Sequence, residues 1–476
     1  MNALKKIILS VSCLAFTGIS FAQAPSKMSL KECIELAIKN NLDVQRANLQ
    51  TESAKAYWQQ ARGYLLPDLN ANLSQGANQG RNINPYTNTY IDQNISVGNY
   101  SLSSSLTLFN GLSIQNNIKQ NRAIFEAAGM EAQQKKDNVT LNVILAYLTL
   151  LSNEDLLEVS KNQVQVSTKQ VERLNILNKD GAITPSDLYD LKGQLANDNV
   201  NVVNNLNNME SARLSLAQLL NVNYSKEMDV QRLTLDDINF GYDSSTENIY
   251  KTAAANLAII KAVDLRQKSS VYGVKVARGQ QYPSLVLNGG IGSNYSSAAT
   301  TQEYLSTTYV DNGSYVEANG TKVPVYNPQN EYASHTIPFG DQFKNNRNTY
   351  FSFGLRIPIL NGFQTRTKIR VAKIQQKDAE VIASSTRTQL QQNVEQAYVN
   401  MTSAEKRYRA LSEQVDAYKE SFRIAEVRFT AGSINSVDYL VAKNNFDRSN
   451  VNLIVARYDF VLRTKILDYY QGRPLW

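Results

Sequence analysis

The sequence lacks the features that mark a polytopic helical membrane protein, a disulfide-bonded domain or a metal site. Its only sustained apolar run, Ile7 to Phe16, is short and lies at the amino terminus, whereas a helical membrane protein needs repeated runs of about 20 residues. Of its two cysteines only Cys33 lies outside that run, which excludes an intrachain disulfide framework. The single histidine, His335, has no cysteine or second histidine nearby. We therefore expect no cofactor and no metal.

Catalytic and nucleic-acid-binding signatures are also missing. The sequence has neither the Gly-x-x-x-x-Gly-Lys-Ser/Thr phosphate loop nor the Gly-x-Ser-x-Gly nucleophile elbow. Its formal net charge of +7 is small for 476 residues, and the lysines and arginines form no clustered stripe. We therefore expect neither an enzyme nor a protein that binds nucleic acid.

The amino-terminal run has the layout of a secretory signal peptide. Two lysines precede the apolar segment, and the small-residue site Ser20-Phe21-Ala22 follows it. Cleavage after Ala22 is favoured, because a cut two residues later would place Pro25 at the scissile bond. A lipoprotein signal is disfavoured, because Cys13 lies inside the apolar run. We expect residues 1–22 to be the signal peptide.

The rest of the chain contains two copies of one sequence pattern. Three pairs of segments correspond, namely Ala61–Leu69 with Ala277–Leu285, Phe109–Gly111 with Leu360–Gly362, and Gly181–Asp187 with Gly432–Asp438. Two long copies do not suit a solenoid, whose units number at least three. We expect a first repeat at 23–221 and a second at 248–476. The linker at 222–247 is expected to hold a short strand near 232–238.

Proline-free segments predict three helices in each repeat. All ten prolines lie outside them, and proline breaks a helix. The predicted helices are 30–62, 113–179 and 186–220, followed by 248–280, 363–430 and 437–471.

The two longest predicted helices carry coiled-coil seams, in which apolar residues recur in steps of three and four or of seven. In the second repeat the seam is Ala404, Tyr408, Leu411, Val415, Tyr418, Phe422, Ala425 and Phe429. In the first it is Phe125, Ala132, Val139 and Ala146, then Leu150, Leu157, Val164 and Val171 after a stutter. Helices of this length reach about 100 Å at 1.5 Å per residue. We therefore expect long antiparallel coiled coils.

Between the helices, alternating apolar and polar residues predict β-strands. The predicted strands are Leu69–Leu73, Leu102–Leu108, Leu285–Gly289 and Phe351–Ile359. Strands with one apolar face suit a transmembrane barrel, but four cannot close one, so we expect several chains to share it. Leu106, Phe353 and Ile357 are expected to face lipid. The segments 75–97 and 293–348 are expected to be loops.

This combination resembles the TolC family of outer membrane efflux proteins. Ser29–Asn41 is similar to that family's opening helix, Gly181–Leu188 to its first helix–turn–helix tip, and Ile466–Gly472 to its ending. The resemblance implies a mainly α fold with a β-barrel contribution. In it, a homotrimer completes a 12-stranded barrel with four transmembrane strands per chain, and long antiparallel helices form a periplasmic α-barrel.

The resemblance also implies a location and partners. The chain would serve as the exit duct of a tripartite efflux pump or type I secretion system in the outer membrane of a Gram-negative bacterium. Outer membrane lipid would surround its barrel. Its protein partners would be a periplasmic adaptor protein, also called a membrane fusion protein, and an inner-membrane transporter of RND or ABC type.

Candidate gating residues follow from the same resemblance. Asp438 matches a carboxylate that lines the constriction at the family's second periplasmic tip, and Asp187 holds the equivalent place in the first repeat. Gly181, Gly432 and Phe429 belong to the tip turns and are candidates for contact with the adaptor.

This chain departs from the family's pattern at two tip positions. Val441 stands where some members have a second carboxylate, and Ile434 stands where an arginine is expected in the turn. We therefore expect neither a double acidic ring nor an arginine-mediated link between the tips.

A purely structural role is the alternative for both aspartates. Thr184 or Asn435 can N-cap the returning helix, and an aspartate three residues later favours the helix dipole. Ser29 makes the same pattern at a helix with no pore role. Both roles stay open for Asp187 and Asp438.

Two classes of function are open from the sequence. The first is a passive conduit gated at its helical tips. The second is a secreted coiled-coil scaffold or adhesin without a pore, whose strands are local ribbons. Within the conduit class the sequence does not select among drug efflux, metal export and protein secretion.

Overall fold

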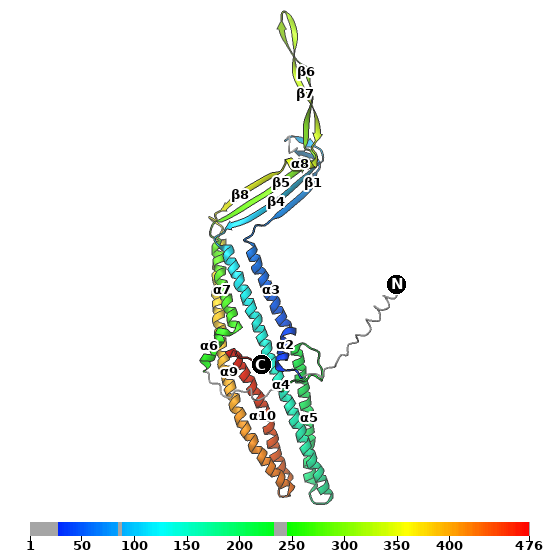
Figure 1. Cartoon of the computed structure of the whole chain (residues 1–476), viewed down its shortest axis with the longest axis vertical. Coiled ribbons are helices and arrows are strands. Elements are labelled where there is room, and N and C mark those ends of the chain that lie inside the picture. The colour runs from blue at the N-terminus through cyan, green and yellow to red at the C-terminus, as the bar shows by residue number, and fades with distance from the viewer. Residues whose placement is uncertain (1–26, 84–87, 233–244, 476) are drawn as a thin grey trace, which may run out of the picture. The chain divides into compact units, whose positions relative to one another are not determined.

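The computed structural model describes residues 27–83, 88–232 and 245–475 (Figure 1). The expected signal peptide and nearly all of the strand expected near 232–238 lie outside these residues. The chain divides into two compact units. The helical unit contains the chain up to Ala54, Ile124–Gln267 and the chain from Ala379, and the strand unit contains Lys55–Ala123 and Lys268–Asp378. Each unit therefore takes segments from both halves of the sequence.

The helices of the two halves match in order and length. The first half has α2 (Leu30–Asn40), α3 (Leu42–Gly63), α4 (Ser113–Lys179) and α5 (Pro185–Leu220). The second half has α6 (Thr246–Asn256), α7 (Ala258–Gly279), α9 (Gln364–Thr430) and α10 (Ser436–Gln471). Both α4 and α9 contain 67 residues, and both α5 and α10 contain 36. None of the helices in the described residues is long and apolar enough to cross a membrane.

The first predicted helix of each half proves to be two helices. Asn41 and Leu257 adopt extended backbone conformations, which end α2 and α6. The side chain of Asn41 then accepts a 3.0 Å hydrogen bond from the backbone N–H of Val44 in the first turn of α3. A single residue thus ends one helix and caps the next, which a proline-free segment gave no reason to expect.

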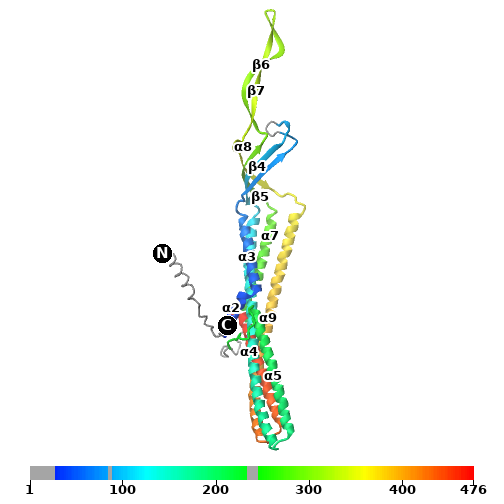
Figure 2. The same ribbon diagram turned by 90° about the vertical axis from the view of Figure 1, so that its right-hand side faces the viewer.

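The predicted seams form the contacts of the helical unit. Every predicted seam residue of α4 and α9 is buried or half-buried, including the buried Ala132, Leu157, Ala404 and Val415. Figures 1 and 2 show α4 beside α5, and α9 beside α10, each pair joined by a turn at the tip. The coiled-coil prediction is therefore confirmed.

The strand unit contains a four-stranded antiparallel sheet with two strands from each half. Its order is β1 (Asn70–Asn78), β4 (Ile95–Phe109), β5 (Ser284–Ser296) and β8 (Asn348–Arg356). Within the described residues, β1 and β8 are its edges. The predicted number of strands for this sheet is confirmed.

The register separates an apolar face of the sheet from a polar one. Leu106 lies opposite Leu287, which lies opposite Phe353, so all three side chains share one face. Ser105 lies opposite Asn288 on the other face. The predicted strand at 351–359 was too long, however, because β8 ends at Arg356 and leaves Ile357 outside the sheet. Pro358 has no N–H for a sheet hydrogen bond and restricts the residue before it.

The expectation that 75–97 and 293–348 are loops was wrong. The first segment contains a short hairpin, β2 (Arg81–Ile83) with β3 (Tyr90–Asp92). The second contains a long hairpin, β6 (Thr300–Ala318) with β7 (Thr321–Thr336), followed by α8 (Phe339–Asn345). Asn319 and Gly320 join β6 to β7, both with positive φ, as a two-residue hairpin turn requires. Asn-Gly is a strong hairpin signal, so the sequence did contain the evidence.

Candidate functional site at the helical tips

The two helical tips have the same backbone geometry. At the end of α4, Gly181 has a φ of 69°, and at the end of α9, Gly432 also has a φ of 69°. The N–H of the residue after each glycine donates to a carbonyl five residues back, from Ala182 to Leu177 over 2.8 Å and from Ser433 to Arg428 over 2.9 Å. This is the Schellman motif, in which the residue after the helix has a positive φ, a conformation that favours glycine. The paired Gly motifs therefore mark two equivalent reversals.

The two returning helices begin differently. In α10 the Asn435 side chain accepts a 2.9 Å hydrogen bond from the backbone N–H of Asp438, as predicted for an N-cap. In α5 Thr184 makes no such bond, and its hydroxyl donates instead to the Asp187 carboxylate at 2.7 Å. The expected cap is thus present only at the second tip.

Asp187 links one tip to the other. Its Oδ1 accepts a 3.3 Å hydrogen bond from the backbone N–H of Ser436, the first residue of α10. The Ser436 hydroxyl donates in turn to Asp190 at 3.0 Å. The hydrogen bond from the Thr184 hydroxyl, reinforced by those from Ser436, lowers the pKa of the Asp187 carboxyl. The first tip therefore provides an acceptor for the amino terminus of α10, the returning helix of the second pair.

An arginine also joins the two tips, from a position outside the turns. Arg173 of α4 donates through Nη2 to the carbonyl oxygen of Thr430, at the end of α9, over 2.5 Å. The family resemblance places an arginine in the turn, where this chain has Ile434. Arg173 belongs instead to the other helix pair. Cations favour helix carboxyl termini, where carbonyls lack helical partners.

Beneath these polar contacts lies a small apolar core. Phe429 is 9% exposed, and its ring stacks on that of the fully buried Tyr439 with centroids 4.7 Å apart. Leu188 and Leu191 of α5 belong to the same cluster. Phe429, a candidate for adaptor contact, thus lies inside the tip, whereas both turn glycines are exposed.

The structure separates the two candidate gating aspartates. Asp438 is exposed in the first turn of α10, where a carboxylate stabilises the helix dipole. Asp187 is half-buried between the two helix pairs. The two residues hold equivalent helix positions, but Asp187 binds within the chain and Asp438 projects from it.

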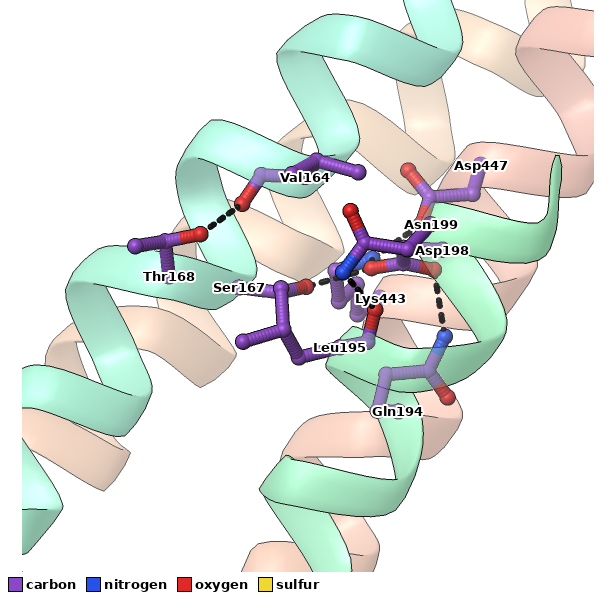
Figure 3. Close-up of polar contacts among 9 residues, drawn as sticks. All are labelled: Val164, Ser167, Thr168, Gln194, Leu195, Asp198, Asn199, Lys443 and Asp447. Atoms are coloured by element: carbon purple, nitrogen blue, oxygen red, sulfur yellow. Dashed lines mark hydrogen bonds and ion pairs between the residues drawn. The ribbon is translucent and has the colours of Figure 1, made fainter. Parts of the chain in front are cut away.

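A buried ionic cluster lies farther along the same helices (Figure 3). Lys443 of α10 is 1% exposed, and its ammonium binds Asp198 of α5 at 3.0 Å and Asp447 at 2.6 Å. Asp198 also accepts hydrogen bonds from Ser167 of α4 and, over 2.8 Å, from Gln194. The cluster joins three helices and places two carboxylates around one cation.

Burial and the neighbouring cation act in opposite directions on a carboxylate of this cluster. Burial raises the pKa of the Asp447 carboxyl, although the nearby Lys443 ammonium opposes the shift. Sequence reasoning missed the cluster. The signal was Lys443 itself, which lies four residues after Tyr439 and four before Asp447, on the helix face that Tyr439 buries.

No group of histidine, cysteine, aspartate or glutamate residues within 27–83, 88–232 and 245–475 could hold a metal ion. The tips instead combine exposed turns, hydrogen bonds between helix pairs and a buried charge cluster. This arrangement joins the two helix pairs at their tips.

Comparisons with known proteins agree with this architecture. The family profile described as "Outer membrane efflux protein" matches residues 33–222 and 249–467. Outer membrane protein TolC of Escherichia coli (strain K12) is 21% identical over 468 residues, covering 97% of this chain and 85% of that protein. TolC of Vibrio cholerae is 24% identical over 334 residues, covering 69% of this chain and 66% of that protein.

Solved structures show the same fold. The outer membrane protein VceC of Vibrio cholerae superimposes with a TM-score of 0.71 at 16% identity, covering 94% of this chain and 97% of that one. The open state of the Neisseria gonorrhoeae MtrE outer membrane channel gives a TM-score of 0.72 at 18% identity, covering 93% and 88%. The predicted mainly α fold with a β contribution is therefore confirmed.

The family match covers most of both halves of the chain, and it favours the conduit over a scaffold or adhesin. It is a family of channels and not of enzymes. The chain belongs to the outer membrane efflux protein family and is an efflux channel of the outer membrane with its helical part in the periplasm.

Proposed function

We propose that three copies of this chain form a passive exit duct that opens and closes at the helical tips and performs no catalysis. The sheet supports three copies, because its four strands leave β1 and β8 as edges. An unpaired edge is costly in lipid, and three copies supply twelve strands. Two copies would supply eight, which leave little lumen once side chains fill it.

Native mass measurement in detergent tests the oligomeric state. The expected species is a trimer of the mature chain. A stable monomer in detergent would contradict the proposal, because its sheet edges would then need no partner.

The exposed tip turns are the proposed contact for a periplasmic adaptor protein, which would couple the duct to an inner-membrane transporter of RND or ABC type. Gly181 and Gly432 lie at the surface of these turns. Phe429 would act indirectly, because its ring supports the second turn from within the tip core.

The hydrogen bonds between the tips carry the gating proposal. Arg173 holds the end of α9, and Asp187 holds the start of α10. An opening that moves one helix pair past the other must break both contacts. In the closed trimer, three exposed Asp438 carboxylates would form a negative ring whose field attracts cations.

Single-channel conductance of the reconstituted trimer tests the ring. Asp438→Ala is expected to raise conductance or weaken block by multivalent cations while trimer yield stays unchanged. Asp187→Ala is the comparison for cation block only, since Asp187 holds the same position in α5 but binds Ser436, and loss of that hydrogen bond is itself expected to favour opening. Equal and negligible effects on cation block would leave Asp438 with the capping role alone.

A further inference from the structure

The β6–β7 hairpin carries all of its tyrosines on one face. Tyr326 and Tyr332 are six positions apart in β7, which contains no inserted residue. Side chains alternate along a strand, so both tyrosines point to the same side. Tyr304 lies directly opposite Tyr332, while Tyr309 and Tyr315 lie opposite Pro328 and Pro324, which belong to the same alternating set. We call this side of the hairpin the tyrosine face.

A bulge in β6 makes this alignment possible. The strand register shifts between Tyr304 and Ser306, so that Leu305 has no partner in β7. Strict alternation would place Tyr304 and Tyr309 on opposite faces, since they are five residues apart. The extra residue restores Tyr309 to the side of Tyr304.

The tyrosine face is large and exposed. Its five tyrosines are between 49% and 70% exposed, which amounts to on the order of 500 Å² of aromatic surface. Monomeric proteins rarely expose larger contiguous apolar patches, and one partner in a specific interface contributes about 800 Å². A two-stranded hairpin is also marginally stable alone in water. This face therefore has the aromatic composition of an interface and more than half of the area that one partner contributes.

Both faces of the hairpin carry charge. The opposite face has no tyrosine and carries Glu303 and Glu331, which contact His335 and Ser306. On the tyrosine face Lys322 lies 4.0 Å from the centre of the Tyr315 ring and opposite Glu317, and Asp311 lies opposite Tyr326. The two faces therefore differ in their tyrosines and not in their number of carboxylates.

The base of the hairpin is anchored to the sheet. Gln342 of α8 is 2% exposed and binds both backbone groups of Ser296, accepting from N–H at 2.9 Å and donating to the carbonyl at 3.0 Å. It also donates to the carbonyl of Ile337 at 2.7 Å, just after β7. The Phe339 ring packs against Tyr100 of β4 and Tyr295 of β5. The hairpin is thus fixed where it joins β5 and leads to edge strand β8.

We propose that the tyrosine face binds the hairpin of a neighbouring copy, so that three hairpins form a collar at the rim of the barrel. This inference rests on the proposed trimer, in which β8 of one copy meets β1 of the next. Equivalent strands of neighbours lie four strands apart, or about 20 Å along the rim at 4.8 Å per strand. A strand of 16 residues extends roughly 50 Å, so neighbouring hairpins can reach each other.

Site-specific photo-cross-linking in cells tests the collar with a matched pair of adjacent positions. A benzophenone amino acid replaces either Tyr309, on the tyrosine face, or Val310, on the opposite face, in the full-length chain. Irradiation at position 309 is expected to give covalent dimers and trimers of this chain, with yields at position 310 at least about tenfold lower. Native mass measurement of the same samples reports the trimer independently.

The outcomes separate the collar from the duct. An intact trimer with no self-cross-link at 309, equal linking from 309 and 310, or a link from 309 to a polysaccharide or another protein would overturn the collar alone. Loss of the trimer in the unmodified chain would overturn both proposals.

Serine substitutions provide a second test. Changing Tyr304, Tyr309 and Tyr326 to serine is expected to lower the temperature at which the trimer dissociates by about 5 °C or more. Val310→Ser with Val316→Ser on the other face should leave that temperature within about 1 °C of the original. Equal shifts in the two variants would contradict the collar.

Discussion

The returning helices α5 and α10 begin with related sequences, but equivalent residues in them have different surroundings. The third residue is aspartate in both, and the eighth is lysine in both, Lys192 in α5 and Lys443 in α10. Lys192 is exposed beside the ring of Tyr189, whereas Lys443 is buried between two carboxylates. The two halves therefore share these helix positions but differ in the surroundings of the equivalent charges.

The difference has an identifiable source. Four residues after Lys443 stands Asp447, but four residues after Lys192 stands Ala196. The second carboxylate near Lys443, that of Asp198, comes from α5 itself. The first half thus supplies the counterion for a lysine of the second half, and the charge pairing runs between the halves.

The largest effect is expected from removing the buried cation. Lys443→Met leaves Asp198 and Asp447 buried without a counterion, and breaking a buried pair costs about 3–5 kcal/mol of unfolding free energy. Lys192→Met, at the equivalent exposed position, should change it by less than about 0.5 kcal/mol. Chemical denaturation of the detergent-solubilised protein measures both.

A triple variant sharpens this contrast. Lys443→Met combined with Asp198→Asn and Asp447→Asn removes every charge of the cluster and should recover most of the loss. If the two lysine variants lose equal stability, the asymmetry between the helices has no energetic consequence.

In the sheet, unlike at the tips, equivalent substitutions in the two halves are expected to have similar effects. Leu106→Arg in β4 and Phe353→Arg in β8 each place a charge on the same apolar face, which costs about 2–4 kcal/mol near the bilayer midplane. Yield in the outer membrane fraction should fall in both variants and much less in Ser105→Arg. Ile357→Arg, beyond the end of β8, should cost less than Phe353→Arg. A yield that falls only for Ser105→Arg would mean that the faces are reversed.

Capping provides a smaller contrast. Asn435→Ala removes a hydrogen bond to the first turn of α10 and should cost about 1 kcal/mol. Thr184→Ala removes no cap bond, so its cost should be less than half as large. Thermal unfolding of the two variants compares them, and a larger loss for Thr184→Ala would show that its hydrogen bond to Asp187 outweighs the cap.

The smallest expected effect is the pH dependence of the Asp187 link. Its pKa is lowered in the folded chain, chiefly by the Thr184 hydroxyl. The stabilisation is therefore complete above the unfolded pKa of about 3.9 and is lost as the pH falls through the lower folded value. Asp187→Asn should flatten this acid limb of the stability profile. An unchanged acid limb in Asp187→Asn would contradict the assignment.

Local pattern was enough to predict most of the helical architecture. The seams of α4 and α9 repeat every few residues, so a short window of sequence identifies their buried face. The strands of the main sheet followed from alternation in the same way. The predictions failed where one residue changes the local backbone, as at Asn41, Pro358 and the Asn319-Gly320 turn.

The sequence by itself determined the long helices and the four strands of the main sheet, which helix faces are apolar, and that the two halves share one plan. These properties depend on residues within a few turns or pairs of each other. Only the tertiary structure decided that Lys443 is buried, that Asp187 binds Ser436, and that one bulge aligns the tyrosines of the hairpin. Those outcomes depend on partners hundreds of residues away or on the register between strands. Periodicity along a single chain specifies neither the distant partner of a residue nor the register between two strands.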